Sequence, residues 1–277
     1  MKKNERAAAI VRTIVVSLIA VLFVVPLVWM VLSSLKTAPE VFARPFHWLP
    51  AKAQWQNYAT VWMNEEASML RAFANTLYIA LFSIVGQMFI SSLAAYSFAK
   101  INFKGKQVVF MLFLSSMMVP SQLTIIPRFM LFKTIGLYNN LWAIILPAFF
   151  GATSIFMLRQ FYMGLPNDLI EAAKIDGAGH LRIFLRIMLP LTKAALMSLI
   201  ILAFISSWNE YMAPLIFLVK KELYTVSQNI QWYMLDEFKE HNLTMAAATS
   251  AIVPVVILFF VGQKYFVEGI ATSGVKG

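Results

Sequence analysis

Glu171-Ala172-Ala173-Lys174-Ile175-Asp176-Gly177, followed by Ile187-Met188-Leu189-Pro190, is a polar stretch inside an apolar chain. It belongs to a segment of residues 163–190 that lies between long uncharged runs. Glycine is the usual residue for the left-handed turn that ends a helix, so Gly177 predicts a helix end. A second helix is predicted from about His180 to Leu189. A helix–turn–helix of this kind on a membrane protein indicates a docking element; the alternative is an ordinary amphipathic connector.

The second helix of this segment is predicted to have two different faces. Four apolar residues follow the i, i+3, i+4, i+7 spacing that places side chains on one side of a helix. They are Leu181, Phe184, Leu185 and Met188. Arg182 and Arg186 lie four residues apart and predict a charged face elsewhere on the same helix.

The composition of the whole chain is that of a polytopic membrane protein. Its 277 residues are 60% hydrophobic and 13% charged, whereas soluble domains have about 45–50% apolar and about 25% charged residues. The net charge of +10 is assigned to orientation in the bilayer, where Lys and Arg favour the cytoplasmic side, and not to nucleic-acid binding. The chain has 0 cysteines, which excludes disulfides and thiolate sites.

Uncharged runs predict six membrane spans in one permease domain of residues 1–277. The spans are residues 13–35, 72–99, 107–127, 137–160, 194–217 and 242–263. Crossing the hydrocarbon takes about 20 residues, so the fifth run is long enough only if its helix continues past Glu210 to about Phe217. The first run exceeds the roughly 7–15 apolar residues of a secretory signal, and we interpret it as a retained helix.

The distribution of basic residues predicts the orientation of the chain. With six spans, both termini and the 163–190 segment share one side, which carries 14 of the 23 Lys and Arg residues. The other side carries 9. Cytoplasmic loops have the excess of basic residues, so the termini and this segment are predicted to be cytoplasmic.

Two polar stretches within the predicted spans are candidates for a solute path. Pro120-Ser121-Gln122 combines a helix break with polar groups, although proline kinks are also common for purely structural reasons. Trp208-Asn209-Glu210 places a carboxylate at membrane depth, which is costly against lipid and indicates a function. The alternative for Glu210 is a solvated helix end.

Catalytic and metal motifs are missing from the sequence. Gly105-Lys106 is followed by Gln107, so there is no phosphate-binding P-loop, and no H-E-x-x-H pattern occurs. The three histidines, His47, His180 and His241, lie far apart in the sequence. We therefore predict no catalytic residues and no metal site.

The first stretch quoted above resembles the EAA loop of binding-protein-dependent ABC importers, in both its residues and its spacing. In that family the loop fits a cleft of a cytoplasmic ATPase, which implies an ATPase-coupling role for the matching positions. These are Glu171, Ala172, Ala173, Asp176, Gly177, Ile187, Leu189 and Pro190. Met117 to Gln122, Trp208-Asn209-Glu210 and the tail from Gln263 to Gly277 are similar to MalG-like carbohydrate permeases.

The resemblance implies an all-α type I ABC importer permease in the bacterial inner membrane. It implies as partners a second, MalF-like permease subunit, a cytoplasmic ATPase dimer that uses ATP and magnesium, and an extracytoplasmic solute-binding protein. The chain itself would need no cofactor, and its substrate would be a sugar or oligosaccharide. A polyol or glycerophosphate permease stays an alternative, as do a stand-alone channel, a secondary transporter and a membrane-embedded enzyme.

Overall fold

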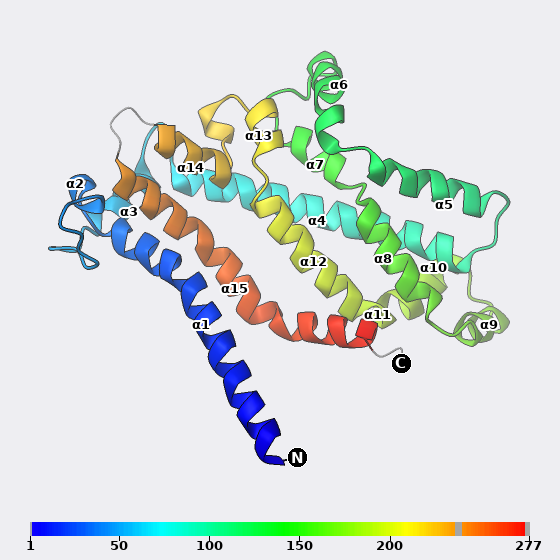
Figure 1. The fold of residues 1–277 in the computed structure, drawn as a ribbon. Helices are drawn as coiled ribbons and strands as arrows, with labels where there is room; N and C mark the ends of the chain where they lie inside the picture. The colour runs from blue at the N-terminus through cyan, green and yellow to red at the C-terminus, as the bar shows by residue number, and fades with distance from the viewer. Residues whose placement is uncertain (1, 236–239, 275–277) are drawn as a thin grey trace. The chain divides into compact units, whose positions relative to one another are not determined.

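In the computed structural model, residues 2–235 and 240–274 are described, and every regular element in these ranges is helical (Figure 1). In chain order they are α1 (Lys2–Ser34), α2 (Ala38–Val41), α3 (Gln56–Met63), α4 (Met69–Lys100), α5 (Lys106–Ser115), η1 (Ser116–Met118), α6 (Ser121–Thr134), α7 (Trp142–Ala148), α8 (Ala152–Met163), α9 (Asp168–Ile175), α10 (His180–Ile183), η2 (Phe184–Met188), α11 (Leu189–Leu191), α12 (Lys193–Trp208), α13 (Met212–Phe217), η3 (Lys221–Leu223), α14 (Val226–Leu235) and α15 (His241–Gly274). The end of the tail motif, residues 275–277, lies outside the described residues.

The chain forms two compact units. The first unit contains Met1–Leu70 and Asn229–Val253, and the second contains Arg71–Gln228 and Pro254–Gly277. Both units are discontinuous in sequence, because boundaries between them fall inside α14 and α15. A discontinuous unit cannot be found from composition shifts along the chain.

Within the described residues, 4 helices are long and apolar enough to cross a membrane alone. They are Ala8–Ser34, Met69–Lys100, Trp142–Met163 and His241–Gln263. Two further spans arise only if a bent helix pair counts as one span, which brings the total to as many as 6. One pair joins Lys106–Met118 to Ser121–Thr134 at 96°, and the other joins His180–Leu191 to Lys193–Trp208 at 76°.

The predicted span 107–127 is not one continuous helix but is interrupted at the proline that predicted a break. Its chain turns at Val119 and Pro120, whose backbones are extended (ψ 113° and 132°). Proline has no N–H to continue the helical ladder, and it disfavours helical backbone at the residue before it. Pro120 consequently stands outside both helices as the residue that precedes α6.

The predicted fifth span, residues 194–217, is likewise not one continuous helix. Helix α12 ends at Trp208, and α13 begins at Met212. In an unbroken helix the ring of Pro214 would meet the carbonyl of Glu210, four residues earlier. Instead, the Glu210 side chain accepts a hydrogen bond from the backbone N–H of Ala213 at 3.0 Å, which stabilises the start of the new helix.

A hydrophobic core in the second unit joins helices that are distant in sequence. It contains residues from α4, α8, α9, α10, η2 and α12, with Tyr96, Tyr162 and Phe184 among its large side chains. Helix α4 also packs closely against the break between α7 and α8. A Cβ at Gly86 would collide with the ring of Phe149. This position therefore requires glycine.

In the first unit, buried Asn57 connects several segments. Its Nδ2 donates to the carbonyl oxygens of Ser34 and Lys36 at 2.8 and 2.9 Å, where α1 ends. Its Oδ1 accepts from Nδ2 of Asn242 at 3.1 Å. Helix α1 itself buries 0% of its most apolar window, as expected of a helix whose surroundings are lipid or another membrane subunit.

Candidate functional site

The EAA-like segment forms α9 and a well-defined turn after it. Gly177 has the left-handed backbone (φ +77°) that its position predicted. The N–H of Gly177 donates to the carbonyl of Lys174 at 3.0 Å, and the N–H of Ala178 donates to that of Ala173 at 2.9 Å. These two bonds are the Schellman motif, which satisfies carbonyls at a helix end.

Half of the apolar stripe predicted for the second helix is buried. Phe184 and Met188 are buried together with Ile183, whereas Leu181 and Leu185 are 65% and 48% exposed. After α10, residues Phe184–Met188 form a π-helical turn. Such a turn has i→i+5 hydrogen bonds in place of i→i+4 and changes the direction of the side chains around the helix. Pro190 lies within the short α11 that follows and does not end the helix.

The loop is built onto the hydrophobic core of the second unit. Ile170 and Ala173 of α9 and Ile183 of α10 lie in the same cluster as side chains of α4, α8 and α12. In addition, the hydroxyl of Tyr96 and Nδ1 of His180 are 3.1 Å apart and form a hydrogen bond. Figure 1 shows α9 and α10 beside the ends of α4 and α8. The loop is thus attached to the membrane helices through these side chains.

The residues matched to the EAA pattern fall into two groups in the structure. Glu171, Ala172, Asp176, Gly177 and Pro190 are exposed. Ala173 is buried, and Ile187 and Leu189 are half-buried. The first group can meet a partner, and the second supports the loop from below.

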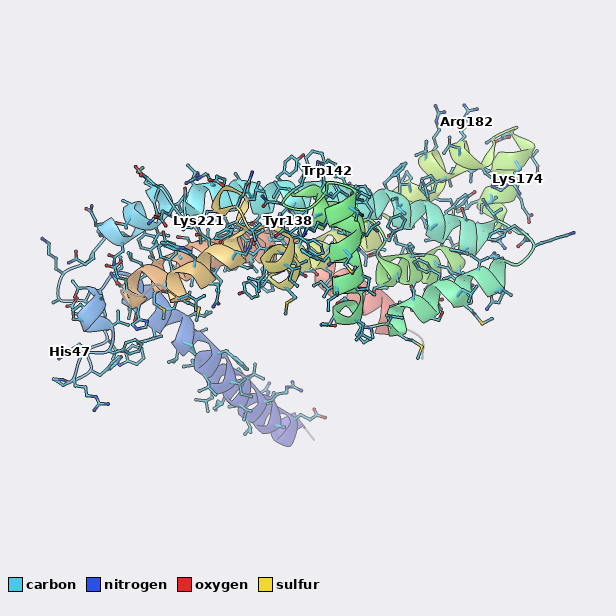
Figure 2. All side chains as sticks on the ribbon, turned by 90° about the horizontal axis from the view of Figure 1, so that it is seen from above. His47, Tyr138, Trp142, Lys174, Arg182 and Lys221 are labelled. Carbon is cyan, nitrogen blue, oxygen red and sulfur yellow. The ribbon has the colours of Figure 1, made fainter. Side chains whose placement is uncertain are left out.

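The outer surface of the loop has apolar residues that sequence reasoning did not identify as contacts. Ile175 is 86% exposed and lies beside Asp176 at the end of α9. Figure 2 shows Lys174 and Arg182 pointing away from the helices at the same end of the molecule. Exposed apolar side chains bordered by charged ones are typical of a protein interaction site. In the sequence, the signal for this contact was Ile175 itself, a large apolar residue two positions before Gly177.

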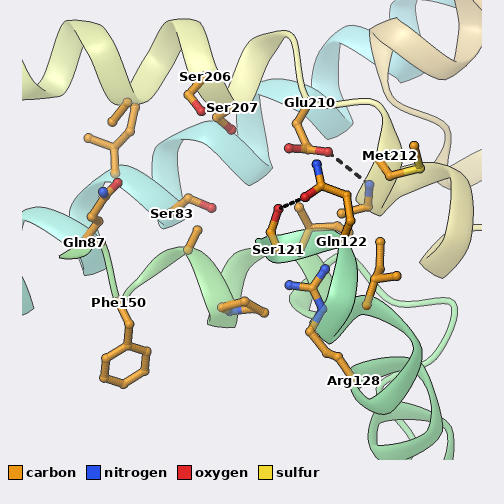
Figure 3. Close-up of a pocket in the computed structure, with 18 residues that line it drawn as sticks. Ser83, Gln87, Ser121, Gln122, Arg128, Phe150, Ser206, Ser207, Glu210 and Met212 are labelled. Atoms are coloured by element: carbon orange, nitrogen blue, oxygen red, sulfur yellow. Dashed lines mark hydrogen bonds between the residues drawn. The ribbon is translucent and has the colours of Figure 1, made fainter. Parts of the chain in front are cut away.

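A cavity of about 420 Å³ lies among the membrane helices of the second unit (Figure 3). Its walls come from α4, α6, α7, α12 and α13 and from the two breaks after α7 and α12. The volume lies within the range of about 300–1,000 Å³ that is typical of small-molecule sites. The start of α6, directly after Pro120, and the break after α12 therefore border one cavity.

Three of the six predicted path residues line this cavity, namely Ser121, Gln122 and Glu210. Ser121 Oγ and Gln122 Oε1 are 3.5 Å apart. Trp208 lies elsewhere: it is 2% exposed, stacks on Phe204 at 5.4 Å and meets the edge of Phe73 at 5.3 Å.

The remaining two predicted path residues, Pro120 and Asn209, are not among the lining residues. Asn209 donates through Nδ2 to the carbonyl of Ile205 at 2.8 Å, which caps the end of α12. A role of these residues in solute passage stays a prediction.

Five polar residues that line the cavity were not among the predicted path residues, namely Ser83, Gln87, Arg128, Ser206 and Ser207. Ser83 of α4 and Arg128 of α6 line it together with Glu210. Arg128 lies over the ring of Phe217, with its guanidinium carbon 4.9 Å from the ring centre, and it also interacts electrostatically with Glu210. Arg128 directly follows the uncharged run that ends at Pro127, and this isolated charge was the available signal. Among the described residues, no three His, Cys, Asp or Glu side chains are grouped to hold a metal.

Residues 87–272 match the protein family described as "Binding-protein-dependent transport system inner membrane component". The chain is 33% identical over 267 residues to the arabinooligosaccharides transport system permease protein AraQ of Bacillus subtilis (strain 168), covering 96% of this chain and 95% of AraQ. It is 30% identical over 266 residues to the sn-glycerol-3-phosphate transport system permease protein UgpE of Pectobacterium atrosepticum, covering 94% of each.

The fold also matches a solved structure. A chain of a bacterial ABC transporter involved in the import of the acidic polysaccharide alginate superposes with a TM-score of 0.84 at 24% identity. The match covers 95% of this chain and 98% of that one. At this identity the likeness concerns the fold alone.

Proposed function

Because the chain belongs to the family of binding-protein-dependent transport system inner membrane components, we propose that it is a permease subunit of an ATP-driven oligosaccharide importer. In this proposal it forms a translocation path with a second permease subunit in the bacterial cell membrane. A cytoplasmic ATPase dimer binds the loop of residues 163–190 and hydrolyses ATP with magnesium. An extracytoplasmic binding protein delivers the solute.

The observation that carries the proposal is the shared core beneath the loop. Ile170 and Ala173 of α9 pack in one cluster with residues of α4 and α12, and those two helices also line the cavity. Packed interiors move as rigid bodies because they have few voids to absorb a displacement. A force applied to the loop by an ATPase would therefore reach both walls of the cavity. This connection supports alternating access driven from the cytoplasm.

The substrate class is supported by the relative named for arabinooligosaccharides, which this chain matches over 96% of its length. The relative named for sn-glycerol 3-phosphate supports a second candidate, a glycerophosphate permease, at 30% identity. The two candidates differ in charge, since a phosphomonoester is an anion at neutral pH and an oligosaccharide of plain pentoses is uncharged.

Reconstitution of the complete importer in proteoliposomes tests the proposal. The chain is purified with its partner permease, the ATPase and the binding protein, and ATP-dependent uptake is measured for radiolabelled arabinotriose and for glycerol 3-phosphate. A complex with a hydrolysis-deficient ATPase serves as the control. Uptake of arabinotriose that requires ATP hydrolysis is the expected result. Uptake of glycerol 3-phosphate alone would replace the proposal with the second candidate.

A further inference from the structure

The cavity contains polar atoms that have no hydrogen-bond partner within the described part of the chain. Ser83 is 3% exposed, and its Oγ has no partner among the described residues. The same holds for Nε of Arg128, which is buried although other atoms of its side chain are accessible. Both residues line the cavity. Buried polar atoms in proteins nearly always have a hydrogen-bond partner. Two unpaired atoms in one cavity therefore indicate a bound group that supplies the missing partners.

The charges facing the cavity balance each other. Figure 3 shows Arg128 and Glu210 approaching the cavity from opposite sides, one from α6 and one from the break after α12. The Glu210 carboxylate is held in place by the backbone N–H of Ala213 at 3.0 Å. Arg128 is cationic and Glu210 is anionic. An anionic ligand is therefore attracted by Arg128 but repelled by Glu210, and a cationic ligand is attracted by Glu210 but repelled by Arg128.

Hydroxyl groups fit this environment best among common solute groups. Each hydroxyl can donate one hydrogen bond and accept others. Arg128 supplies donors only, Glu210 supplies an acceptor, and Ser83 and Gln122 supply both kinds. The cavity volume of about 420 Å³ suits a small polar ligand group.

We propose that this cavity binds one uncharged sugar unit of the transported oligosaccharide, whose hydroxyls pair with Ser83 Oγ and Arg128 Nε–H. Glu210 acts as the specificity-determining residue, because it cancels the charge of Arg128 and so excludes anionic solutes. The assignment rests on the proposed importer function but adds to it a binding site and a substrate charge.

The first test compares two serines of the same helix. Ser83→Ala removes the hydroxyl that faces the cavity. Ser91→Ala is the matched control, since Ser91 Oγ on α4 is also buried and unpaired among the described residues but does not line the cavity. Uptake of subsaturating arabinotriose by the reconstituted complex is expected to fall about threefold to tenfold in Ser83→Ala, the effect of one hydrogen bond, and to stay at the wild-type rate in Ser91→Ala. The amount of assembled complex is checked by size-exclusion chromatography.

The second test measures the charge of the cavity and its occupancy. The chain has 0 cysteines, so Gln122→Cys provides a single thiol at the cavity. The reaction rate of this thiol is measured with a negatively charged and with a positively charged methanethiosulfonate reagent. Both rates are measured in the Gln122→Cys variant and in the double variant that also carries Glu210→Gln. The ratio of the anionic to the cationic rate is expected to rise about threefold or more when Glu210 is neutralised, because Arg128 is then uncompensated. Saturating arabinotriose is expected to slow both reactions in the variant that retains Glu210.

The outcomes separate the site from the general function. If the wild-type complex imports arabinotriose but Ser83→Ala equals Ser91→Ala and the thiol is not protected, the site is overturned while the proposed function stands. If the wild-type complex imports no uncharged oligosaccharide, the proposed function fails and the sugar assignment fails with it. An unchanged reagent ratio in Glu210→Gln would contradict the role given to Glu210.

Discussion

Nζ of Lys100 lies 2.7 Å from Oδ1 of Asn167 and donates a hydrogen bond to it. Lys100 is the last residue of α4, and Asn167 directly precedes α9. The same Nζ also donates to the carbonyl oxygen of Leu165 at 2.6 Å. The helix that carries Ser83 into the cavity is thus tied at its C-terminal end to the loop of residues 163–190.

We predict that Lys100→Met uncouples the loop from α4. The variant loses both hydrogen bonds, which we expect to weaken the attachment of the loop by roughly 1–2 kcal/mol. The ratio of oligosaccharide-stimulated to basal ATP hydrolysis should fall in the reconstituted complex. Asn167→Ala removes only one acceptor and should have a smaller effect. Lys104→Met, at an exposed lysine of the nearby loop, is the control, and an equal loss there would refute the role of Lys100.

Gly177→Ala is predicted to destabilise the turn after α9, whereas Gly179→Ala is not. Both positions have open space around an added Cβ, but only Gly177 has a positive φ (+77°). A side chain in the left-handed region costs about 1–2 kcal/mol. Gly177→Pro also loses the N–H that donates to Lys174, and we expect it to abolish stimulated ATP hydrolysis. Hydrogen exchange of residues 168–183 measures the turn, and equal protection in the two alanine variants would contradict the prediction.

Ile175→Asp is predicted to weaken binding of the ATPase dimer. Ile175 is 86% exposed on α9, and burying such a side chain in an interface contributes about 1.5–3 kcal/mol. Glu171→Lys should weaken the same complex by reversing an exposed charge, and Glu171→Gln should weaken it less. Affinity is measured by titrating the ATPase onto the purified permease pair. Wild-type affinity in both Ile175→Asp and Glu171→Lys would place the ATPase contact elsewhere.

The chain is predicted to have a cytoplasmic C-terminus. The side that shares the termini carries 14 Lys and Arg residues and the opposite side 9, and basic loops remain in the cytoplasm. A reporter that is active only outside the cytoplasm should be silent when fused after residue 277. The same reporter should be active when inserted within residues 54–64. The reverse pattern would show an inverted orientation.

Acid is predicted to loosen the loop that follows α1. The N–H and hydroxyl of Thr37 and the N–H of Ala51 donate to Glu40, and these bonds lower the pKa of its carboxyl group below the usual 4.5. A lowered pKa in the folded state adds stability above the unfolded pKa, and this stability is lost as the pH falls through the folded value. The protection factors of residues 37–51 in hydrogen exchange, which correct for the intrinsic pH dependence of amide exchange, should therefore fall below about pH 4.5. In Glu40→Gln the protection factors should be low at all pH values; a pH dependence that matches the wild type would exclude Glu40 as its origin.

The sequence alone determined the features that depend on local chemistry. Uncharged runs predicted the membrane helices, because a charged residue is costly in hydrocarbon wherever it occurs along the chain. The left-handed turn at Gly177 was predictable because only glycine adopts that backbone at no steric cost. Pro120 predicted a kink, although not a bend of 96°.

The tertiary structure alone decided how these segments meet. Leu181 and Leu185 are exposed while Phe184 and Met188 are buried, because packing against the core, and not the helical period alone, selects which side chains are buried. Ser83 and Arg128 are separated by 45 positions in the sequence and face one cavity because α4, α6 and α12 converge there. Such convergence results from nonlocal packing, to which no single residue pattern corresponds, and it therefore could not be predicted from one sequence.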